Sequence, residues 1–87
     1  MKKVEIIPIA ERKLKRRGIK REWIEDTLLN PLQVVDSYGR RKVAQKKFLI
    51  NDKEYLLRVV YEDKEKVYTV VTTYLTTQIG RYWKEEK

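Results

Sequence analysis

The sequence predicts an α+β fold in which two N-terminal helices pack on one face of a four-stranded antiparallel meander sheet. Apolar residues recur at helical spacing within residues 8–29, and runs rich in Val, Tyr, Leu and Thr follow within residues 33–75. Brief polar breaks separate those runs, which indicates hairpin connections between neighbouring strands. The 87 residues suffice for one domain, expected over residues 1–87 and ending in a short C-terminal tail.

Two helices are expected before the sheet. Residues 4–7 are a short strand or an extended lead-in, and Pro8 suits the first turn of a helix that runs to about residue 17. Gly18 is placed to end that helix in a left-handed conformation. A second helix is expected over residues 21–29, ended by the Asn-Pro pair that follows. Its Trp23 shares a face with other apolar residues, so we interpret it as a core anchor rather than a base-stacking surface.

The remainder is expected to form strands over residues 33–38, 41–50, 54–62 and 67–75. Alternation in the third strand points Leu57 and Val59 toward the helices and Arg58 toward the opposite, open face. A lone guanidinium at a strand centre is unfavourable unless it faces water or a ligand. The fourth strand cannot be assigned to a face because both of its sides are apolar, which is typical of a central strand.

The charge of the chain favours a polyanionic partner. Lys and Arg number 21 against 13 Asp and Glu, a net charge of +8. Such a surplus suits nucleic acid, an acidic protein or an anionic membrane surface, whereas abundant charge of both signs is also typical of a heat-adapted surface. Without cysteine or histidine, the chain has no disulfide, no thiol nucleophile and no imidazole base. We therefore expect no metal site and no cofactor.

The N-terminal residues do not resemble a signal peptide, because Glu5 and Pro8 interrupt a short apolar run. No stretch approaches the roughly 20 apolar residues that a membrane-spanning helix needs. A soluble cytoplasmic protein is expected.

Candidate contacts to nucleic acid fall on the first helix and on the sheet. The basic run that begins at Arg12 can bind phosphates, and the alternative is an ordinary solvated helix face. On the sheet, Arg58 can be joined by Lys46 or Lys47, which point to opposite faces, and by Arg40 or Arg41. Interleaved basic and aromatic residues suit single-stranded nucleic acid, whereas a cross-strand pair of Arg58 would contribute only roughly 0.2–1 kcal/mol of stability. The candidate nucleic-acid-binding residues are Arg16, Arg17, Arg40, Lys46, Lys47, Tyr74 and Arg81.

The order of elements and three stretches of sequence resemble the RelE/ParE-like toxins, including the BrnT branch. The stretch L-R-V-V-Y-E-D-K-E-K-V-Y-T-V-V-T-T-Y (residues 57–74) is similar to the hairpin of the RelE ribosome-dependent mRNA endonucleases. The opening R-R-G-I-x-x-E-x-I-x-x-x-L-x-x-P (residues 16–31) and the closing R-Y-W (residues 81–83) are similar to short prokaryotic relatives of those toxins. The similarity spans most of the chain.

This resemblance implies a RelE-like fold and metal-independent cleavage of ribosome-associated mRNA without histidine. In that family, basic residues activate the 2′-OH and stabilise charge on the phosphate, with a C-terminal tyrosine nearby. Arg58 matches the arginine of the penultimate strand and Tyr82 matches the terminal tyrosine, so these two are the candidate catalytic residues. Lys46 and Lys47 lie near the lysines of the preceding strand.

One position departs from the family pattern. The second arginine of the family falls on Thr76 or Thr77, and loss of one transition-state contact of this kind typically costs ~10²–10³-fold in rate. The sequence therefore leaves three functions open. The protein is a toxin of a toxin–antitoxin pair that cleaves mRNA, a non-catalytic nucleic-acid-binding module, or an interaction protein whose basic surface binds an acidic antitoxin.

Overall fold

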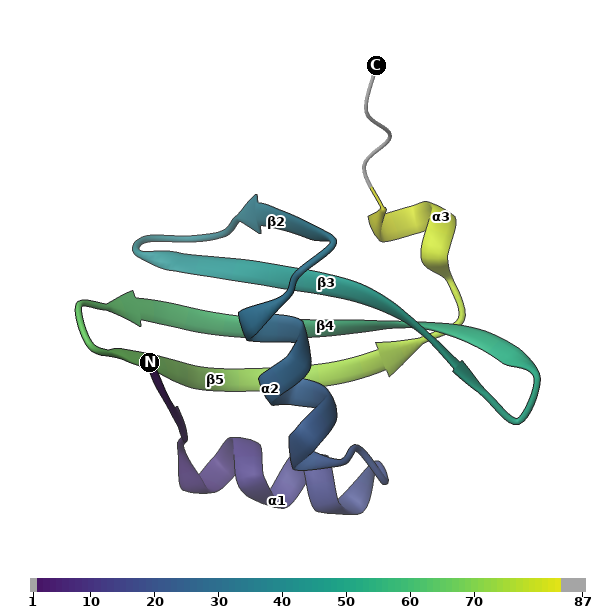
Figure 1. Cartoon of the computed structure of the whole chain (residues 1–87), viewed down its shortest axis with the longest axis horizontal. Coiled ribbons are helices and arrows are strands. Elements are labelled where there is room, and N and C mark those ends of the chain that lie inside the picture. The colour runs from purple at the N-terminus through teal and green to yellow at the C-terminus, as the bar shows by residue number, and fades with distance from the viewer. Residues whose placement is uncertain (1, 84–87) are drawn as a thin grey trace.

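A five-stranded mixed sheet in the order β1-β5-β4-β3-β2 organises the protein, whose computed structural model describes residues 2–83 (Figure 1). The strands are β1 (Lys3–Ile6), β2 (Gln33–Asp36), β3 (Arg41–Ile50), β4 (Lys53–Lys64) and β5 (Val67–Thr76). The helices are α1 (Pro8–Arg16), α2 (Arg21–Leu29) and α3 (Ile79–Tyr82). None of these helices in the described part of the chain is long and apolar enough to cross a membrane.

The predicted four-stranded, wholly antiparallel sheet is wrong, because β1 adds a fifth strand that runs parallel to β5. The pairing joins Lys3 to Val67 and continues to Ile6 opposite Val70. β5 therefore lies between β1 and β4 over its first half, which explains the apolar residues on both of its faces. A parallel partner so far away in sequence is joined by no hairpin, so no turn marks the pairing in the sequence.

The predicted C-terminal tail is also wrong over its described part, since residues 79–82 form α3. This helix turns back from the end of β5 toward β3 (Figure 1). Residues 84–87, which belong to the predicted tail, lie outside the described residues. Residues 79–83 thus return to the sheet and contribute to the candidate site below.

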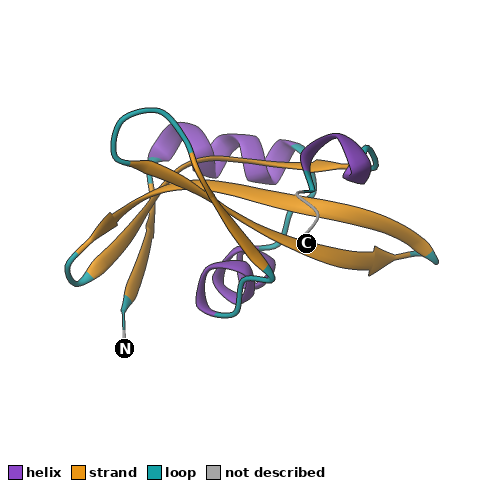
Figure 2. Ribbon diagram, turned by 90° about the horizontal axis from the view of Figure 1, so that it is seen from above, coloured by secondary structure: helices purple, strands orange, loops and turns teal. Residues whose placement is uncertain are grey.

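One hydrophobic cluster joins α1 and α2 to the sheet. Its buried members are Ala10, Leu14, Ile19, Ile24, Leu28, Ala44, Leu57, Val59, Tyr61 and Val70. Figure 1 shows α2 lying across the sheet and α1 running alongside β5, and Figure 2 shows the β3–β4 hairpin projecting beyond them. Gly18 ends α1 with a φ of 68°, and the next amide bonds back to the Leu14 carbonyl at 2.9 Å. Burial of each large aliphatic side chain in this cluster stabilises the fold by ~1.5–3 kcal/mol.

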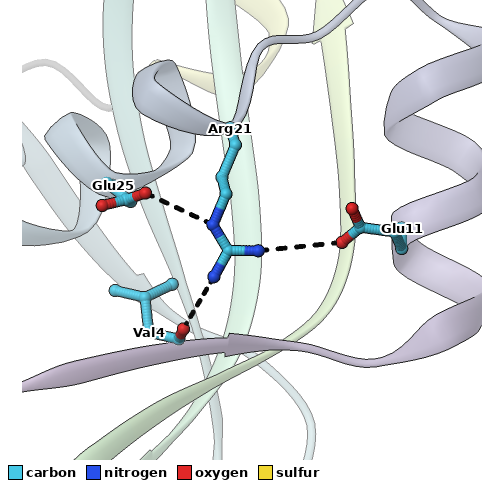
Figure 3. A network of polar contacts seen from close by, with 4 residues as sticks. All are labelled: Val4, Glu11, Arg21 and Glu25. Atoms are coloured by element: carbon cyan, nitrogen blue, oxygen red, sulfur yellow. Dashed lines mark hydrogen bonds and ion pairs between the residues drawn. The ribbon is translucent and has the colours of Figure 1, made fainter.

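Arg21 connects β1, α1 and α2 (Figure 3). Its Nη2 donates to the Val4 carbonyl at 3.0 Å, its Nε lies 3.3 Å from Glu25, and its Nη1 lies 3.9 Å from Glu11. The Arg21 side chain is 50% exposed, so each ion pair contributes at most ~0.2–1 kcal/mol. The contacts of Arg21 therefore orient β1, α1 and α2 and supply little of the stability of the fold.

Two backbone features fix the register around Arg58. The β3–β4 hairpin turns at Asn51 and Asp52, whose φ values of 50° and 63° are those of a type I′ turn, and this register places Gln45 opposite Arg58. In the β4–β5 pair a bulge follows, because Tyr61 pairs with Val70 while Val60 pairs with Thr72. The bulge shifts Tyr74 opposite Arg58 and reverses which residues of β5 face the helices.

Candidate nucleic-acid interface

The Arg58 guanidinium lies between two tyrosines on the face of the sheet away from α1 and α2. Its Nε donates to Gln45 Oε1 at 2.6 Å, and its Nη1 donates to the Tyr74 hydroxyl. The guanidinium carbon lies 4.3 Å from the ring centroid of Tyr82 and 5.3 Å from that of Tyr74. The two rings also meet edge to face, with centroids 6.0 Å apart. The structure therefore brings Arg58, Tyr74 and Tyr82 together; with Gln45, we call these residues the Arg58 cluster.

Gln45 holds this cluster in place. Its side chain is fully buried, and it accepts the Arg58 hydrogen bond while its Nε2 donates to Gln33 Oε1 at 2.8 Å. The same nitrogen makes a longer contact of 3.4 Å to the Tyr82 carbonyl, which ties α3 to β3. A buried amide bonded on both of its ends has one orientation available, so the carbonyl oxygen of Gln45 is committed to Arg58.

The face that carries Arg58 is less open than the sequence indicates. Val43, Gln45 and Leu56 are all buried, and all three alternate onto the face of Arg58. The short α3 and the residue after it lie against this face, as the contacts of Tyr82 and Trp83 show. Arg58 itself is half-buried, so a ligand can reach only its outer edge.

Of the two candidate lysines, Lys47 lies on the Arg58 face and Lys46 does not. Lys47 Nζ lies 4.4 Å from the ring centroid of Trp83, a cation–π contact beside the Arg58 cluster. Lys46 points to the helix side and pairs with Asp26 at 2.7 Å. The hydrogen bond from Lys46 holds the pKa of the Asp26 carboxyl below its usual value. Lys46 therefore joins α2 to β3 and takes no part in the Arg58 cluster.

The remaining predicted contacts are spread over the surface. Arg81 lies at the rim of the cluster, with its guanidinium carbon 5.6 Å from the Tyr82 ring. Arg40 is exposed in the β2–β3 turn, at the opposite end of β3 from Lys47. Arg16 is exposed at the end of α1, and the neighbouring Arg17 donates to the Thr73 carbonyl at 2.7 Å. Arg81 therefore borders the Arg58 cluster, whereas Arg16, Arg17 and Arg40 lie away from it.

The charge of Arg58 has no carboxylate neighbour within residues 2–83, since every hydrogen-bond and ring partner given above is neutral. An amide, a phenol and two rings orient a guanidinium without cancelling its charge. Such a cation attracts a phosphate, and the aromatic rings beside it offer surfaces on which bases stack. Arg41, by contrast, is paired with Glu62 at 3.6 Å.

Two further observations limit the chemistry of the site. No group of three or more acidic side chains in the described residues can hold a metal ion. Thr76 ends β5, and its hydroxyl accepts a hydrogen bond from the backbone amide of Gln78 at 3.0 Å. Thr76 thus begins the turn into α3, and it is one of the two positions, 76 and 77, at which the resemblance places a second cation.

Sequence reasoning missed Gln45 and Trp83. The signal for Gln45 was present, because a two-residue Asn-Asp turn between two strands sets their register and pairs Gln45 with Arg58. Trp83 had no such signal, since nothing local to it shows that the chain turns back over the sheet.

Comparison with known proteins identifies the family. Residues 10–75 match DUF4258, described as a domain of unknown function. The chain belongs to the DUF4258 family. No curated protein and no solved structure matches it. The matched stretch of this DUF4258 protein contains Gln45, Arg58 and Tyr74, while Tyr82 and the whole of β1 and α3 lie outside it.

Proposed function

We propose that this DUF4258 protein is a cytoplasmic, toxin-like protein that binds RNA through the Arg58 cluster and cleaves it without a metal ion. One observation carries the proposal. A half-buried guanidinium, with no carboxylate partner among residues 2–83, is held beside two tyrosine rings, and Lys47 and Trp83 extend that basic and aromatic surface. A sheet face of this composition suits single-stranded RNA.

Cleavage at such a site needs a base for the 2′-OH, an acid for the 5′ oxygen and a positive charge beside the phosphate. The 2′-OH attacks the adjacent phosphate, the bond to the 5′ oxygen breaks, and the products end in a 2′,3′-cyclic phosphate and a 5′-hydroxyl. Arg58 would stabilise the charge that develops on the phosphate oxygens. The hydroxyls of Tyr74 and Tyr82 are the groups of the cluster able to pass a proton to or from the reacting oxygens.

Binding without cleavage is the second candidate, and the hydrogen bonds of Arg58 favour it. Two of its three nitrogens already donate to Gln45 and Tyr74. The position at which the resemblance expects another cation carries Thr76 or Thr77. Two of the five N–H groups of Arg58 are thus committed, and neither position 76 nor position 77 supplies the cation that the resemblance expects, so the cluster holds a phosphate more readily than it stabilises a transition state.

The test compares wild type with Arg58→Ala on a labelled single-stranded RNA containing no stable hairpin. Lys64→Ala is the matched control, because it removes one exposed cation from the far end of β4. Arg58→Ala should weaken binding about tenfold or more, while Lys64→Ala should weaken it much less. Equal binding by wild type and Arg58→Ala at ~50 mM salt, where phosphate contacts are strongest, overturns the proposal.

Cleavage is read on the same RNA in the presence of a metal chelator. Product ends bearing a 2′,3′-cyclic phosphate, formed by wild type and not by Arg58→Ala, support catalysis. Growth arrest on induced expression of wild type, and its absence with Arg58→Ala, tests the toxin assignment in cells. Binding without product over a long incubation selects the non-catalytic candidate.

An acidic antitoxin is the protein partner that the net charge of +8 suits best. Co-expression with the protein encoded by the adjacent gene should relieve the growth arrest and yield a complex that dissociates at high salt. A neighbouring protein that neither binds nor relieves the arrest removes this part of the proposal.

A further inference from the structure

A cavity of about 360 Å³ lies on the helix side of the sheet, on the other side from the Arg58 cluster. Its walls come from the α1–α2 connection, the first turn of α2 and the ends of β3, β4 and β5. The lining residues are Arg17, Gly18, Trp23, Ile50, Tyr55 and Leu75. A volume of this size falls within the ~300–1,000 Å³ typical of small-molecule sites.

Strand register separates this cavity from the Arg58 cluster. Tyr55 pairs with Phe48, and Leu75 pairs with Leu57, a buried member of the cluster that α1 and α2 cover. Arg58 alternates to the other face of β4. A ligand in the cavity therefore cannot touch the Arg58 guanidinium, and the two sites can be tested independently.

Arg17 supplies a fixed positive charge at this cavity. Its Nη1 donates to the Thr73 carbonyl at 2.7 Å. Thr73 lies in the second half of β5, after the residues that pair with β1. This bond anchors the guanidinium and leaves its other N–H groups for a ligand. Within residues 2–83 no acidic side chain pairs with Arg17, and the lining contains no carboxylate.

Aromatic side chains complete the lining. Trp23 is half-buried and packs one side on Phe48, with ring centroids 5.8 Å apart. Lys20 Nζ lies 5.7 Å from the Trp23 ring and adds a second cation near it. Trp23 is thus both a core contact, as the sequence predicts, and a cavity wall beside Tyr55.

We propose that this cavity binds a nucleotide, with its phosphate on Arg17 and its base against Trp23 and Tyr55. A planar guanidinium fork matches the oxygens of a phosphate, and aromatic faces bind bases of any sequence. The two apolar lining residues, Ile50 and Leu75, suit the planar base rather than the phosphate. The nucleotide can be free or can be the 5′-phosphorylated end of an RNA chain, which offers the same chemistry.

The test uses Trp23 as its own reporter. The chain has two tryptophans, so Trp83→Phe leaves fluorescence from Trp23 alone. Adenosine monophosphate and guanosine monophosphate are titrated into this variant, in parallel with a short RNA carrying either a 5′-phosphate or a 5′-hydroxyl. Saturable quenching by the monophosphates supports a site for free nucleotide, and quenching only by the 5′-phosphorylated RNA supports a site for an RNA end. No saturable change with any ligand up to ~10 mM, a concentration that detects even millimolar affinity, overturns the proposal.

Substitutions then assign the contacts in the Trp83→Phe background. Arg17→Ala should weaken nucleotide binding about ten- to hundredfold, and Arg16→Ala, which removes an exposed neighbouring cation, should leave it nearly unchanged. Tyr55→Leu is the second variant, because it keeps an apolar side chain and does not alter the bond between Arg17 and Thr73. Circular dichroism confirms that each variant is folded. A folded Arg17→Ala or Tyr55→Leu protein that binds like its parent overturns the proposal, whereas Arg58→Ala should bind nucleotide normally whatever its effect on RNA.

Discussion

Replacement of Gln45 by methionine tests whether the Arg58 cluster is a connected network. Met has a similar length and no hydrogen-bonding group comparable to the amide, so Gln45→Met removes the acceptor for Arg58 Nε and the donor to Gln33 together. Gln45 is fully buried, so little room exists for water to replace the lost partner. The guanidinium then keeps its charge but loses the hydrogen-bond acceptor of its Nε.

The expected cost follows from these bonds. A hydrogen bond to a charged group contributes ~1.5–3 kcal/mol and a neutral one ~0.5–1.5 kcal/mol. The 3.4 Å contact to the Tyr82 carbonyl is too long to add much. The apolar methionine recovers part of the loss by removing a buried amide. We therefore expect Gln45→Met to lower the free energy of unfolding by about 2–3 kcal/mol.

A double-mutant cycle shows whether this loss belongs to the bond with Arg58. Urea unfolding is measured for wild type, Gln45→Met, Arg58→Met and the double variant. Once Arg58 is methionine, the buried acceptor at position 45 has no charged donor, so the second substitution should cost at least about 1 kcal/mol less than it does in wild type. Losses that add within ~0.5 kcal/mol would show that Gln45 and Arg58 stabilise the fold independently, and would refute the network.

Three further predictions follow from the surroundings of single residues. In a salt series, Lys47→Met should reduce the slope of log affinity for RNA against log salt concentration by about 1. Lys46→Met should leave this slope unchanged, because Lys46 is paired with Asp26. Asp26→Asn should lower the free energy of unfolding by ~0.2–1 kcal/mol in urea near pH 7. The pKa of the folded Asp26 carboxyl is lowered, so this group favours folding only while it is ionised. The difference from wild type should therefore vanish as the pH falls below about 3.8. Burial raises the pKa of Tyr61 above 10.0, so wild type should lose stability as the pH rises past that value, and Tyr61→Phe should lose less in alkaline melts.

The hairpin between β3 and β4 could be predicted because its information is local. Two turn residues, Asn51 and Asp52, tolerate the positive φ that a type I′ turn requires. From that turn the alternation of apolar residues correctly places Leu57 and Val59 in the core. The pairing of Arg58 with Gln45 also follows from this turn.

The face assignment of β5 could not be predicted, because a bulge changes it midway. Val70 and Thr73 are both fully buried although they differ by an odd number of positions. Both can face the core only because β5 has one extra residue between the pairs Tyr61–Val70 and Val60–Thr72. Simple alternation therefore allows both faces to be buried, and only the three-dimensional pairing shows which half of the strand supplies which face.

The parallel pairing of β1 and the return of α3 depend on contacts between distant parts of the chain. β1 has four residues, and its partner β5 lies near the other end of the sequence. α3 is equally short, and its position is set by Tyr82 and Trp83 against β3 and β4. Elements this short gain their stability from tertiary packing, so their own sequences carry little evidence of where they lie.

The distribution of ion pairs bears on the two explanations of the surplus charge. A surface adapted to heat organises its cations into networks with carboxylates. Within residues 2–83, the paired cations are Lys2, Arg21, Arg41 and Lys46, and only Arg21 contacts more than one carboxylate. Those pairs join elements of the fold, whereas Arg17, Lys47 and Arg58 have no acidic partner in that range. Lys47 and Arg58 lie over aromatic rings on one face of the sheet, and Arg17 shares a cavity with Trp23 and Tyr55 on the other, an arrangement that supports the proposed anionic, base-containing ligands.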